Sequence, residues 1–253
     1  MIQVSGLSKT FHDRKRGDVP AVRGVSFTCR PGQVFGLLGR NGAGKTTTLR
    51  MLATILVPTG GTATVAGFDI VQKPAEVRRR IGYLSGDTKL YDRLTGRELL
   101  QYFGALAGMP RGAIADRIRE LTTPFGLTEL LDKRVGAMST GMKQRLSIAR
   151  VVFHDPEVLI FDEPTAGLDV IGARTVLALI QELKGKGRTV IFSTHIMTEA
   201  ERICDEIAII ERGTLLAEGS IESVRGADRS RSLEDAFVDV VGAKGAAEGN
   251  GDR

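Results

Sequence analysis

The chain has 253 residues, of which 42% are hydrophobic and 26% charged, and its net charge is +5 at pH 7. This length suits one large α/β unit, and the composition is that of a globular protein. The basic residues are spread among acidic neighbours without interleaved aromatics, which argues against a nucleic-acid-binding protein. Two cysteines are too few for a disulfide framework, and no apolar run reaches the roughly 18 residues of a bilayer-spanning helix. We therefore expect a soluble chain.

Short β-rich runs open the chain, at Ile2–Val4, Val25–Cys29 and Val34–Leu38. Turn residues separate them, notably Pro31 and Gly32, and a Pro-Gly pair is a strong turn signal. Because short strands joined by turns pair with their neighbours, we predict an N-terminal antiparallel β subdomain.

A glycine-rich loop follows the third strand and reads GRNGAGKTT. Its glycines fall where the backbone must bend to aim consecutive N–H groups at phosphate oxygens. Lys45 supplies a positive charge for the β- and γ-phosphates, and the Thr46 hydroxyl is a ligand for Mg²⁺. The predicted contacts with a nucleoside triphosphate are Gly39, Arg40, Asn41, Gly42, Ala43, Gly44, Lys45, Thr46 and Thr47.

A predicted helix, Lys45–Leu56, and two further strands, Thr62–Val65 and Ile81–Leu84, follow the loop. Residues 87–155 then have helical periodicity, which predicts an inserted α-helical lobe. Within it, Thr95 and Glu98 have the spacing of a capping box. The apolar positions expected on the inner helix faces are Leu99, Leu100, Phe103, Leu106, Ile114, Ile118, Leu121, Leu146, Ile148, Ala149 and Val152.

Strand-like segments return at Val158–Phe161, Thr189–Ser193, Ile207–Ile210 and Thr214–Ala217. Strands that alternate with helices predict a largely parallel sheet. The expected fold class is therefore α/β, with a P-loop NTPase core, a mainly parallel sheet, the antiparallel β subdomain and the inserted helical lobe.

The segment EVLIFDE, residues 157–163, delivers two carboxylates at the end of a buried strand. Ligands bind at this end of the strands in open α/β sheets. With a phosphate loop upstream, the pattern predicts Asp162 as a Mg²⁺ ligand and Glu163 as the base for the attacking water.

The segment MSTGMKQR, residues 138–145, begins a predicted helix at Ser139. A Ser-capped helix N-terminus binds phosphate, although it is also common as plain structure. Its position shortly before the strand with the two carboxylates favours phosphate binding. Here the chain resembles the ATP-binding subunits of ABC transporters, whose signature reads Leu-Ser-Gly-Gly-Gln. The resemblance implies nucleotide contacts from Ser139, Thr140 and Gly141.

Other motifs add to the resemblance. PTAGLD, residues 164–169, is similar to the family's D-loop and implies a contact from Asp169. His195, in Ser-Thr-His after a predicted strand, is similar to the switch histidine that reads the γ-phosphate, so the implied catalytic residues are Glu163, His195 and Lys45. Phe11 is either the aromatic residue that stacks on adenine in this family or a Phe of a loop or the core.

The signature and one neighbouring segment depart from the family pattern. Gly86 stands where the family has a Mg²⁺-binding glutamine, and the adjacent Asp87 is the candidate replacement ligand. Thr140 and Met142 replace the first Gly and the final Gln of the signature. Because its Ser and second Gly are retained, we expect the phosphate contact to persist.

The resemblance covers about residues 1–225, and within the family the chain most resembles bacterial efflux subunits for sodium extrusion and antibiotic resistance. It implies an ATPase that uses ATP and Mg²⁺ at the cytoplasmic face of the membrane. Its expected role is to power export of sodium ions, drugs or another small solute. An alternative is a soluble ABC-type ATPase that acts on nucleic acid or ribosomes.

Two such domains pack head to tail in this family. The implied partners are therefore a second copy or a paralogous ATPase subunit, together with an integral-membrane permease, and no nucleic acid is expected. The expected domains are an ATPase domain over residues 1–225, which includes the lobe at 87–155, a helical appendage at 226–241 and a disordered tail at 242–253. Ala236, Phe237 and Val240 are expected on one face of the appendage.

Overall fold

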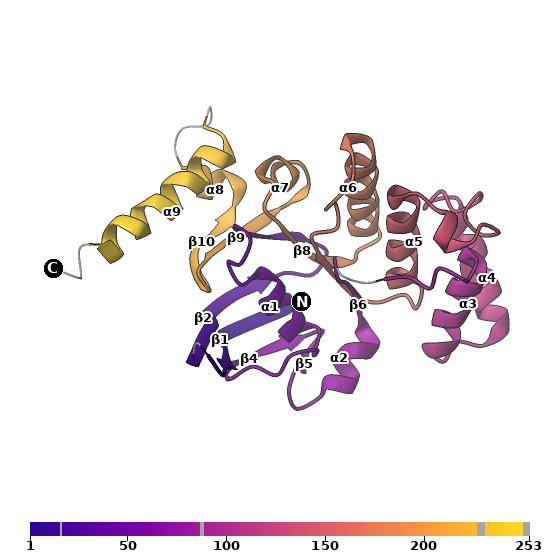
Figure 1. The fold of residues 1–253 in the computed structure, drawn as a ribbon, viewed down its shortest axis with the longest axis horizontal. Helices are drawn as coiled ribbons and strands as arrows, with labels where there is room; N and C mark the ends of the chain where they lie inside the picture. The colour runs from indigo at the N-terminus through magenta and orange to yellow at the C-terminus, as the bar shows by residue number, and fades with distance from the viewer. Residues whose placement is uncertain (16, 87–88, 227–230, 250–253) are drawn as a thin grey trace.

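Two β-sheets form the frame of the molecule (Figure 1). The computed structural model describes residues 1–15, 17–86, 89–226 and 231–249. The first sheet contains the N-terminal hairpin and packs against one face of the second sheet, whose other face is covered by helices. A helical lobe occupies one end of the molecule in Figure 1, and the C-terminal helix extends from the other.

The first sheet is antiparallel, as predicted, with strand order β2-β1-β4-β5. Its strands are β1 (Ile2–Asp13), β2 (Gly17–Cys29), β4 (Gly60–Val65) and β5 (Phe68–Asp69).

The first two strands are longer than the sequence predicts, because their pairing continues to Asp13 opposite Gly17. The outer half of this hairpin is mostly exposed. Its residues therefore lack the apolar and polar alternation that marks a strand in a sequence, and pairing between the two backbones forms the strands instead.

The second sheet has the order β10-β9-β3-β8-β7-β6 and is parallel except for β10, which pairs antiparallel with β9. This confirms the predicted fold class. Its strands are β3 (Val34–Leu38), β6 (Ile81–Leu84), β7 (Val158–Asp162), β8 (Thr189–Thr194), β9 (Glu206–Glu211) and β10 (Thr214–Ser220).

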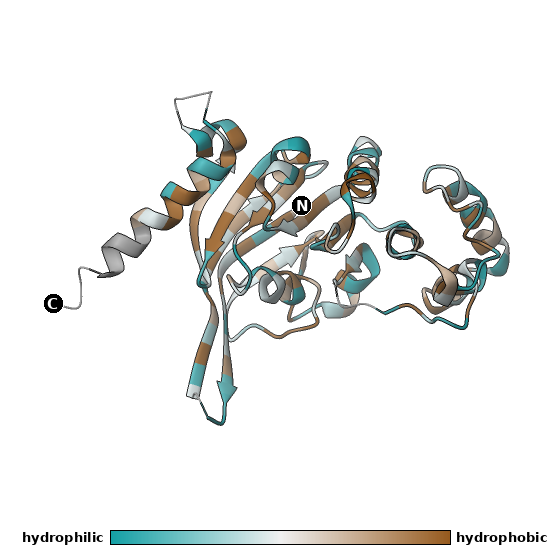
Figure 2. Cartoon of the chain, turned by 45° about the horizontal axis from the view of Figure 1, so that its top comes forward, coloured by the Kyte–Doolittle hydropathy of each residue, from teal (hydrophilic) through white to brown (hydrophobic). Residues whose placement is uncertain are grey.

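Side chains of the central strands alternate between two hydrophobic cores. In β7, Leu159 and Phe161 pack with the helical lobe, whereas Val158 and Ile160 pack with the β subdomain. The side-chain period of two explains this division. Figure 2 shows the consequence, since the strands in the middle of the molecule are mostly brown while the helices carry teal. A strand buried on both faces is continuously apolar, as in parallel sheets generally.

The helical lobe contains the helices that residues 87–155 predict, although residues 87 and 88 lie outside the described part of the chain. Thr95 and Glu98 form the predicted capping box. Leu106 was expected to face the core but is 70% exposed, so this expectation is wrong. It lies at the last position of its helix, where neighbouring helices no longer cover it. The lobe comprises α3 (Gly96–Leu106), α4 (Arg111–Thr122), η1 (Val135–Ala137) and α5 (Thr140–Val152).

Four other helices accompany the large sheet. The helix after the glycine-rich loop ends at Leu52 rather than Leu56, because Thr54 adopts a left-handed backbone conformation. A helix from Pro74 to Arg80 was not predicted, and Pro at its first position suits a helix start. These helices are α1 (Lys45–Leu52), α2 (Pro74–Arg80), α6 (Val170–Gly185) and α7 (Met197–Ile203).

The chain ends in α8 (Ile221–Arg225) and α9 (Leu233–Gly249). Phe237 and Val240 pack against one apolar cluster, and Ala236 is buried, as the periodicity predicts. The tail expected at 242–253 is partly helical instead, since α9 continues to Gly249 and residues 250–253 lie outside the described part. Extending a helix costs far less than starting one, and Ala, Lys and Glu are good helix formers. No helix within the described ranges is long and apolar enough to cross a bilayer.

Candidate nucleotide-binding and catalytic site

The glycine-rich loop connects the buried end of β3 to the start of α1. Gly44 has a φ of 107°, and a Cβ atom there would lie 2.6 Å from the carbonyl oxygen of Ala21 on β2. A Cβ atom on Gly39 would lie 2.2 Å from the carbonyl oxygen of Ile210. Only glycine fits both positions, so the loop takes its shape from its own sequence and from two neighbouring strands.

Lys45 lies inside the curve of this loop, and its side chain is 4% exposed. Its Nζ donates hydrogen bonds to the carbonyl oxygens of Gly39, at 2.7 Å, and Arg40, at 3.1 Å. The same atom lies 3.2 Å from Oε1 of Glu163. A buried ammonium group with three oxygen neighbours is a fixed positive charge at the start of α1, where the helix dipole also favours an anion.

Asp162 ends β7, and the strand order places it beside β8 and near β3. Its Oδ1 accepts hydrogen bonds from Thr46 Oγ1, at 3.0 Å, and from Ser193 Oγ, at 2.7 Å. Ser193 is the register partner of Asp162 on β8 and is fully buried. Ser193 is not among the site residues that the sequence predicts. Its signal is weak, because a Ser at a strand end is common.

Glu163 follows β7 in a left-handed conformation, with φ of 48°. Its backbone N–H donates to Ser193 Oγ at 3.0 Å. Its carboxylate lies between two basic groups, with Oε1 near Lys45 and Oε2 3.2 Å from Nδ1 of His195. Left-handed backbone in a non-glycine residue costs free energy and is concentrated at functional sites. The structure thus brings together three predicted catalytic residues from α1, β7 and the end of β8.

Thr46 and Asp162 present oxygen atoms at one edge of the loop, and oxygen is the ligand that Mg²⁺ prefers. No group of three or more His, Cys, Asp or Glu residues converges on one point in the described part of the chain. One hydroxyl and one carboxylate, from Thr46 and Asp162, fit Mg²⁺, which usually keeps several waters and takes one or two protein ligands. The third predicted ligand, Asp87, lies outside the described residues.

The signature segment lies at the start of α5. Ser139 is the N-cap residue, and its hydroxyl accepts a hydrogen bond from the Met142 N–H at 3.3 Å. Asp169 similarly caps α6 by accepting a hydrogen bond from the Gly172 N–H at 2.7 Å. Ser139, Thr140 and Asp169 line one cavity of about 610 Å³.

The glycine-rich loop lines a different cavity, of about 150 Å³, together with Ala21 and Glu163. The two cavities share no lining residue. Within one chain, therefore, the structure does not bring the signature segment to the loop. Phe11 lines neither cavity: it lies on the outer part of β1, 40% exposed, with the Lys9 ammonium 5.4 Å from its ring centre.

Comparisons with known proteins agree with this geometry. The sequence profile of the ABC transporter family matches residues 22–166. The ABC transporter ATP-binding protein NatA of Bacillus subtilis is 46% identical over 239 residues, which cover 94% of this chain and 97% of the relative. The Nod factor export ATP-binding protein I of a Rhizobium species is 41% identical over 219 residues, which cover 87% and 70%.

A solved structure described as an ATP-binding subunit of an ABC transporter superposes with a TM-score of 0.84 at 29% identity, covering 95% of this chain and 99% of that one. The profile match covers more than half of the chain and includes both the glycine-rich loop and the Asp162–Glu163 pair. The chain therefore belongs to the family of ABC transporter ATP-binding subunits.

Proposed function

We propose that this chain hydrolyses Mg²⁺-bound ATP to drive export of sodium ions, drugs or another small solute through a separate membrane subunit. It acts as a peripheral subunit at the cytoplasmic face of the membrane. The observation that carries the catalytic part is the position of the Glu163 carboxylate, 3.2 Å from both Lys45 Nζ and His195 Nδ1. Membership in the ABC transporter family supports the transport part.

In this proposal, backbone N–H groups of the glycine-rich loop and Lys45 bind the β- and γ-phosphates. Thr46 and Asp162 hold Mg²⁺, which neutralises phosphate charge when bound. Glu163 orients a water and takes its proton as the water oxygen attacks the γ-phosphorus, and the bond to the β-phosphate oxygen breaks to release ADP. His195 contacts the γ-phosphate, and its ring also positions Glu163.

The separate cavities support a site that two chains complete. Ser139 and the glycine-rich loop bind phosphate by the same physical means, yet they line different cavities of one chain. In a head-to-tail pair, the Ser139 cavity of one chain covers the nucleotide on the loop of the other. The second chain is a copy of this one or a paralogous ATPase subunit. ATP binding closes the pair, and hydrolysis reopens it.

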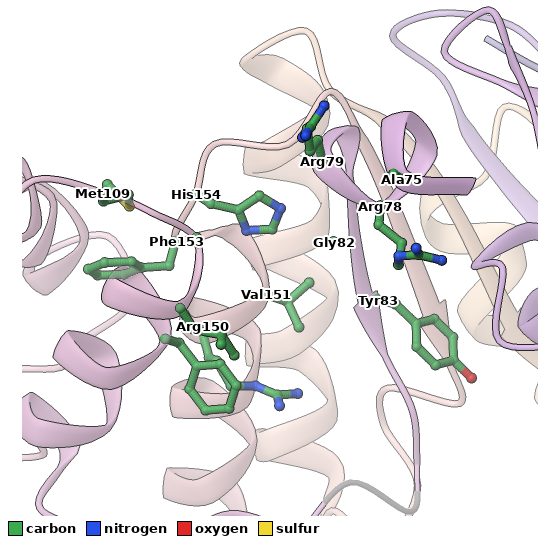
Figure 3. Close-up of a pocket in the computed structure, with 13 residues that line it drawn as sticks. Ala75, Arg78, Arg79, Gly82, Tyr83, Met109, Arg150, Val151, Phe153 and His154 are labelled. Atoms are coloured by element: carbon green, nitrogen blue, oxygen red, sulfur yellow. The ribbon is translucent and has the colours of Figure 1, made fainter. Parts of the chain in front are cut away.

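The helical lobe is the part that transmits this motion to the membrane subunit. A groove of about 820 Å³ lies between the lobe and the strand β6, and α2 lies along its other side. Figure 3 shows Arg150, Phe153 and His154 on one side of this groove and Arg78 and Tyr83 on the other. Its position at the junction of the lobe and the core supports a docking role for a helix of the membrane subunit.

Two substitutions test the catalytic assignment. We expect Lys45→Ala to lose binding of a fluorescent ATP analogue. We expect Glu163→Gln to bind ATP, form a stable dimer on size-exclusion chromatography and show no turnover. Lys186→Ala, which alters an exposed lysine paired with Glu182, is the control and is expected to behave as wild type. Normal ATPase rates in Glu163→Gln would contradict the assignment of the base.

Affinity purification from detergent-solubilised membranes tests the transport assignment. Recovery of a polytopic membrane protein with the wild-type chain supports the proposal. Recovery of ribosomes or nucleic acid in its place contradicts it and favours the soluble alternative.

A further inference from the structure

Arg150 is a partly buried cation outside the proposed catalytic site. It projects from α5 into the groove between α5 and β6. Its guanidinium carbon lies 4.9 Å from the centre of the Phe103 ring. Its Nε is buried and has no hydrogen-bond partner. Burial lowers the pKa of Arg150, while the nearby Tyr91 opposes this shift.

No carboxylate among the described residues forms an ion pair with this guanidinium. The other groups that face the groove are also basic or neutral: Arg78 donates to Thr54 Oγ1, and His154 lies against the carbonyl oxygen of Ile81. Arg79 pairs with Glu76, which also pairs with Arg80. The groove therefore carries net positive charge, and Arg150 has no counter-ion among the residues that the structure describes.

A desolvated charge without a partner is unfavourable, and proteins normally pair such a charge. A second partly buried arginine of the same lobe shows the contrast. Arg117, whose side chain is 14% exposed, bonds to the carbonyl oxygens of Val152 and Phe153 and to the carboxylates of Asp155 and Glu120. In the folded chain, Arg117 therefore has hydrogen-bond and ion-pair partners, whereas the Nε of Arg150 has none. Arg150 is therefore available to a partner from outside the chain.

The apolar lining indicates what kind of partner this is. Phe103, Met109 and Val151 line the groove, and Leu106 at its edge is 70% exposed. A volume of about 820 Å³ far exceeds the roughly 30 Å³ that a water molecule occupies, so one small anion would leave these apolar side chains uncovered. A helix that carries an acidic residue among apolar ones satisfies both the charge and the apolar surface.

We propose that Arg150 selects the membrane subunit of this chain by pairing with one Asp or Glu side chain on a docking helix. The inference rests on the proposed function, since it takes the groove to be the docking surface for that subunit. It adds that Arg150 recognises the partner and that the recognised group is a carboxylate. Arg150 is a specificity-determining residue, because it discriminates against segments that bring no carboxylate.

The first test uses the isolated chain. We expect Arg150→Met to leave the thermal midpoint unchanged or to raise it, because a methionine fills the same space without a buried charge. We expect the matched control Arg117→Met to lower the midpoint, because it removes the hydrogen bonds to the carbonyl oxygens of Val152 and Phe153 and the ion pairs with Glu120 and Asp155. A midpoint lowered as much in Arg150→Met as in Arg117→Met would show a structural role for Arg150 and overturn the proposal.

The second test uses the membrane subunit recovered with the wild-type chain. We expect Arg150→Met to weaken its binding by at least about tenfold, as loss of one partner of a buried charge pair does. Arg119→Met, which alters an exposed arginine of the same lobe paired with Asp116, is the control and is expected to bind within about twofold of wild type. Binding of Arg150→Met within the same limit would overturn the inference.

Charge reversal identifies the partner residue. We expect Arg150→Glu to abolish binding, and substitution of one acidic residue on the cytoplasmic helices of the membrane subunit by Arg to restore it. If no such substitution restores binding, the proposed pair does not exist. Calorimetry with inorganic phosphate covers the other source of negative charge, and micromolar binding that Arg150→Met abolishes would assign the groove to a small anion. If no membrane protein is recovered at all, the proposed function fails before this inference is reached.

Discussion

At the scale of single residues, a few side-chain hydrogen bonds hold the proposed metal ligand Asp162 and the proposed catalytic base Glu163. Ser193 connects the two carboxylate residues, since its hydroxyl donates to Asp162 and accepts from the backbone of Glu163. The hydroxyl of Thr46, on α1, donates a hydrogen bond to the same oxygen of Asp162. These bonds hold Glu163 in a left-handed conformation that an isolated chain would avoid. Backbone strain at this residue therefore accompanies the proposed catalytic geometry.

This strain predicts that two substitutions at position 163 differ in stability. With φ of 48°, we expect Glu163→Gly to be more stable than Glu163→Ala by about 1 kcal/mol, because only glycine is unstrained there. Both variants are expected to lack turnover. Urea unfolding compares their stabilities. Equal stabilities, or a more stable Ala variant, would show that the backbone at this position is not strained.

His154 predicts a pH dependence of stability. Burial lowers the pKa of His154, and the adjacent Arg117 adds to this, although the bond to Ile81 opposes the shift. Below about pH 6.5, the usual value for histidine, the unfolded chain binds a proton that the folded chain excludes. This contribution therefore lowers stability as pH falls. We expect wild type to lose more unfolding free energy than His154→Gln between about pH 8 and pH 5, and urea titrations across this range measure the difference. If the difference in unfolding free energy between wild type and His154→Gln does not change with pH, the prediction is wrong.

At the scale of elements, the helical lobe depends on helix ends as well as on its core. Both hydrogen bonds of the capping box are present at the N-terminus of α3. Thr95 Oγ1 accepts from the Glu98 N–H, and the Glu98 carboxylate accepts from the Thr95 N–H. This helix contributes Phe103 and Leu106 to the groove. Removing the capping box therefore destabilises a helix that forms part of the proposed docking surface.

The cap predicts the effect of one threonine substitution. We expect Thr95→Ala to lower the free energy of unfolding by about 1 kcal/mol and to increase amide hydrogen exchange in α3. Thr175→Ala, in the interior of α6, is the matched control. It is expected to cost nothing, because alanine is the better helix former at an exposed interior position. Equal losses in the two variants would mean that the capping box does not stabilise α3.

At the scale of the whole molecule, the two proposed phosphate-binding segments belong to different surfaces. The glycine-rich loop ends β3 in the core, whereas Ser139 begins α5 in the lobe. This arrangement predicts complementation between two inactive chains. We expect neither Lys45→Ala nor Ser139→Arg to hydrolyse ATP alone and their mixture to recover turnover, because a mixed dimer contains one intact loop opposite one intact signature. A mixture that stays inactive would contradict a site shared between two copies of this chain.

The local chemistry follows from neighbouring residues in the chain. The spacing of Gly39, Gly44 and Lys45 dictates a phosphate loop, because their backbone conformations and charge act over a few neighbouring residues. Likewise, the capping box at Thr95 and the carboxylates at the end of β7 were readable without a structure. In each case the interacting groups lie within one turn or one strand of each other.

The tertiary structure decided which distant residues meet. Ser193 reaches Asp162 because β8 lies beside β7. The residues of either strand alone do not predict this order of strands. The long β1–β2 hairpin, the helical continuation of α9 and the unpaired Arg150 depend in the same way on contacts between segments far apart in the chain. Local propensity is a property of a few adjacent residues, whereas burial and pairing depend on the packing of the whole molecule.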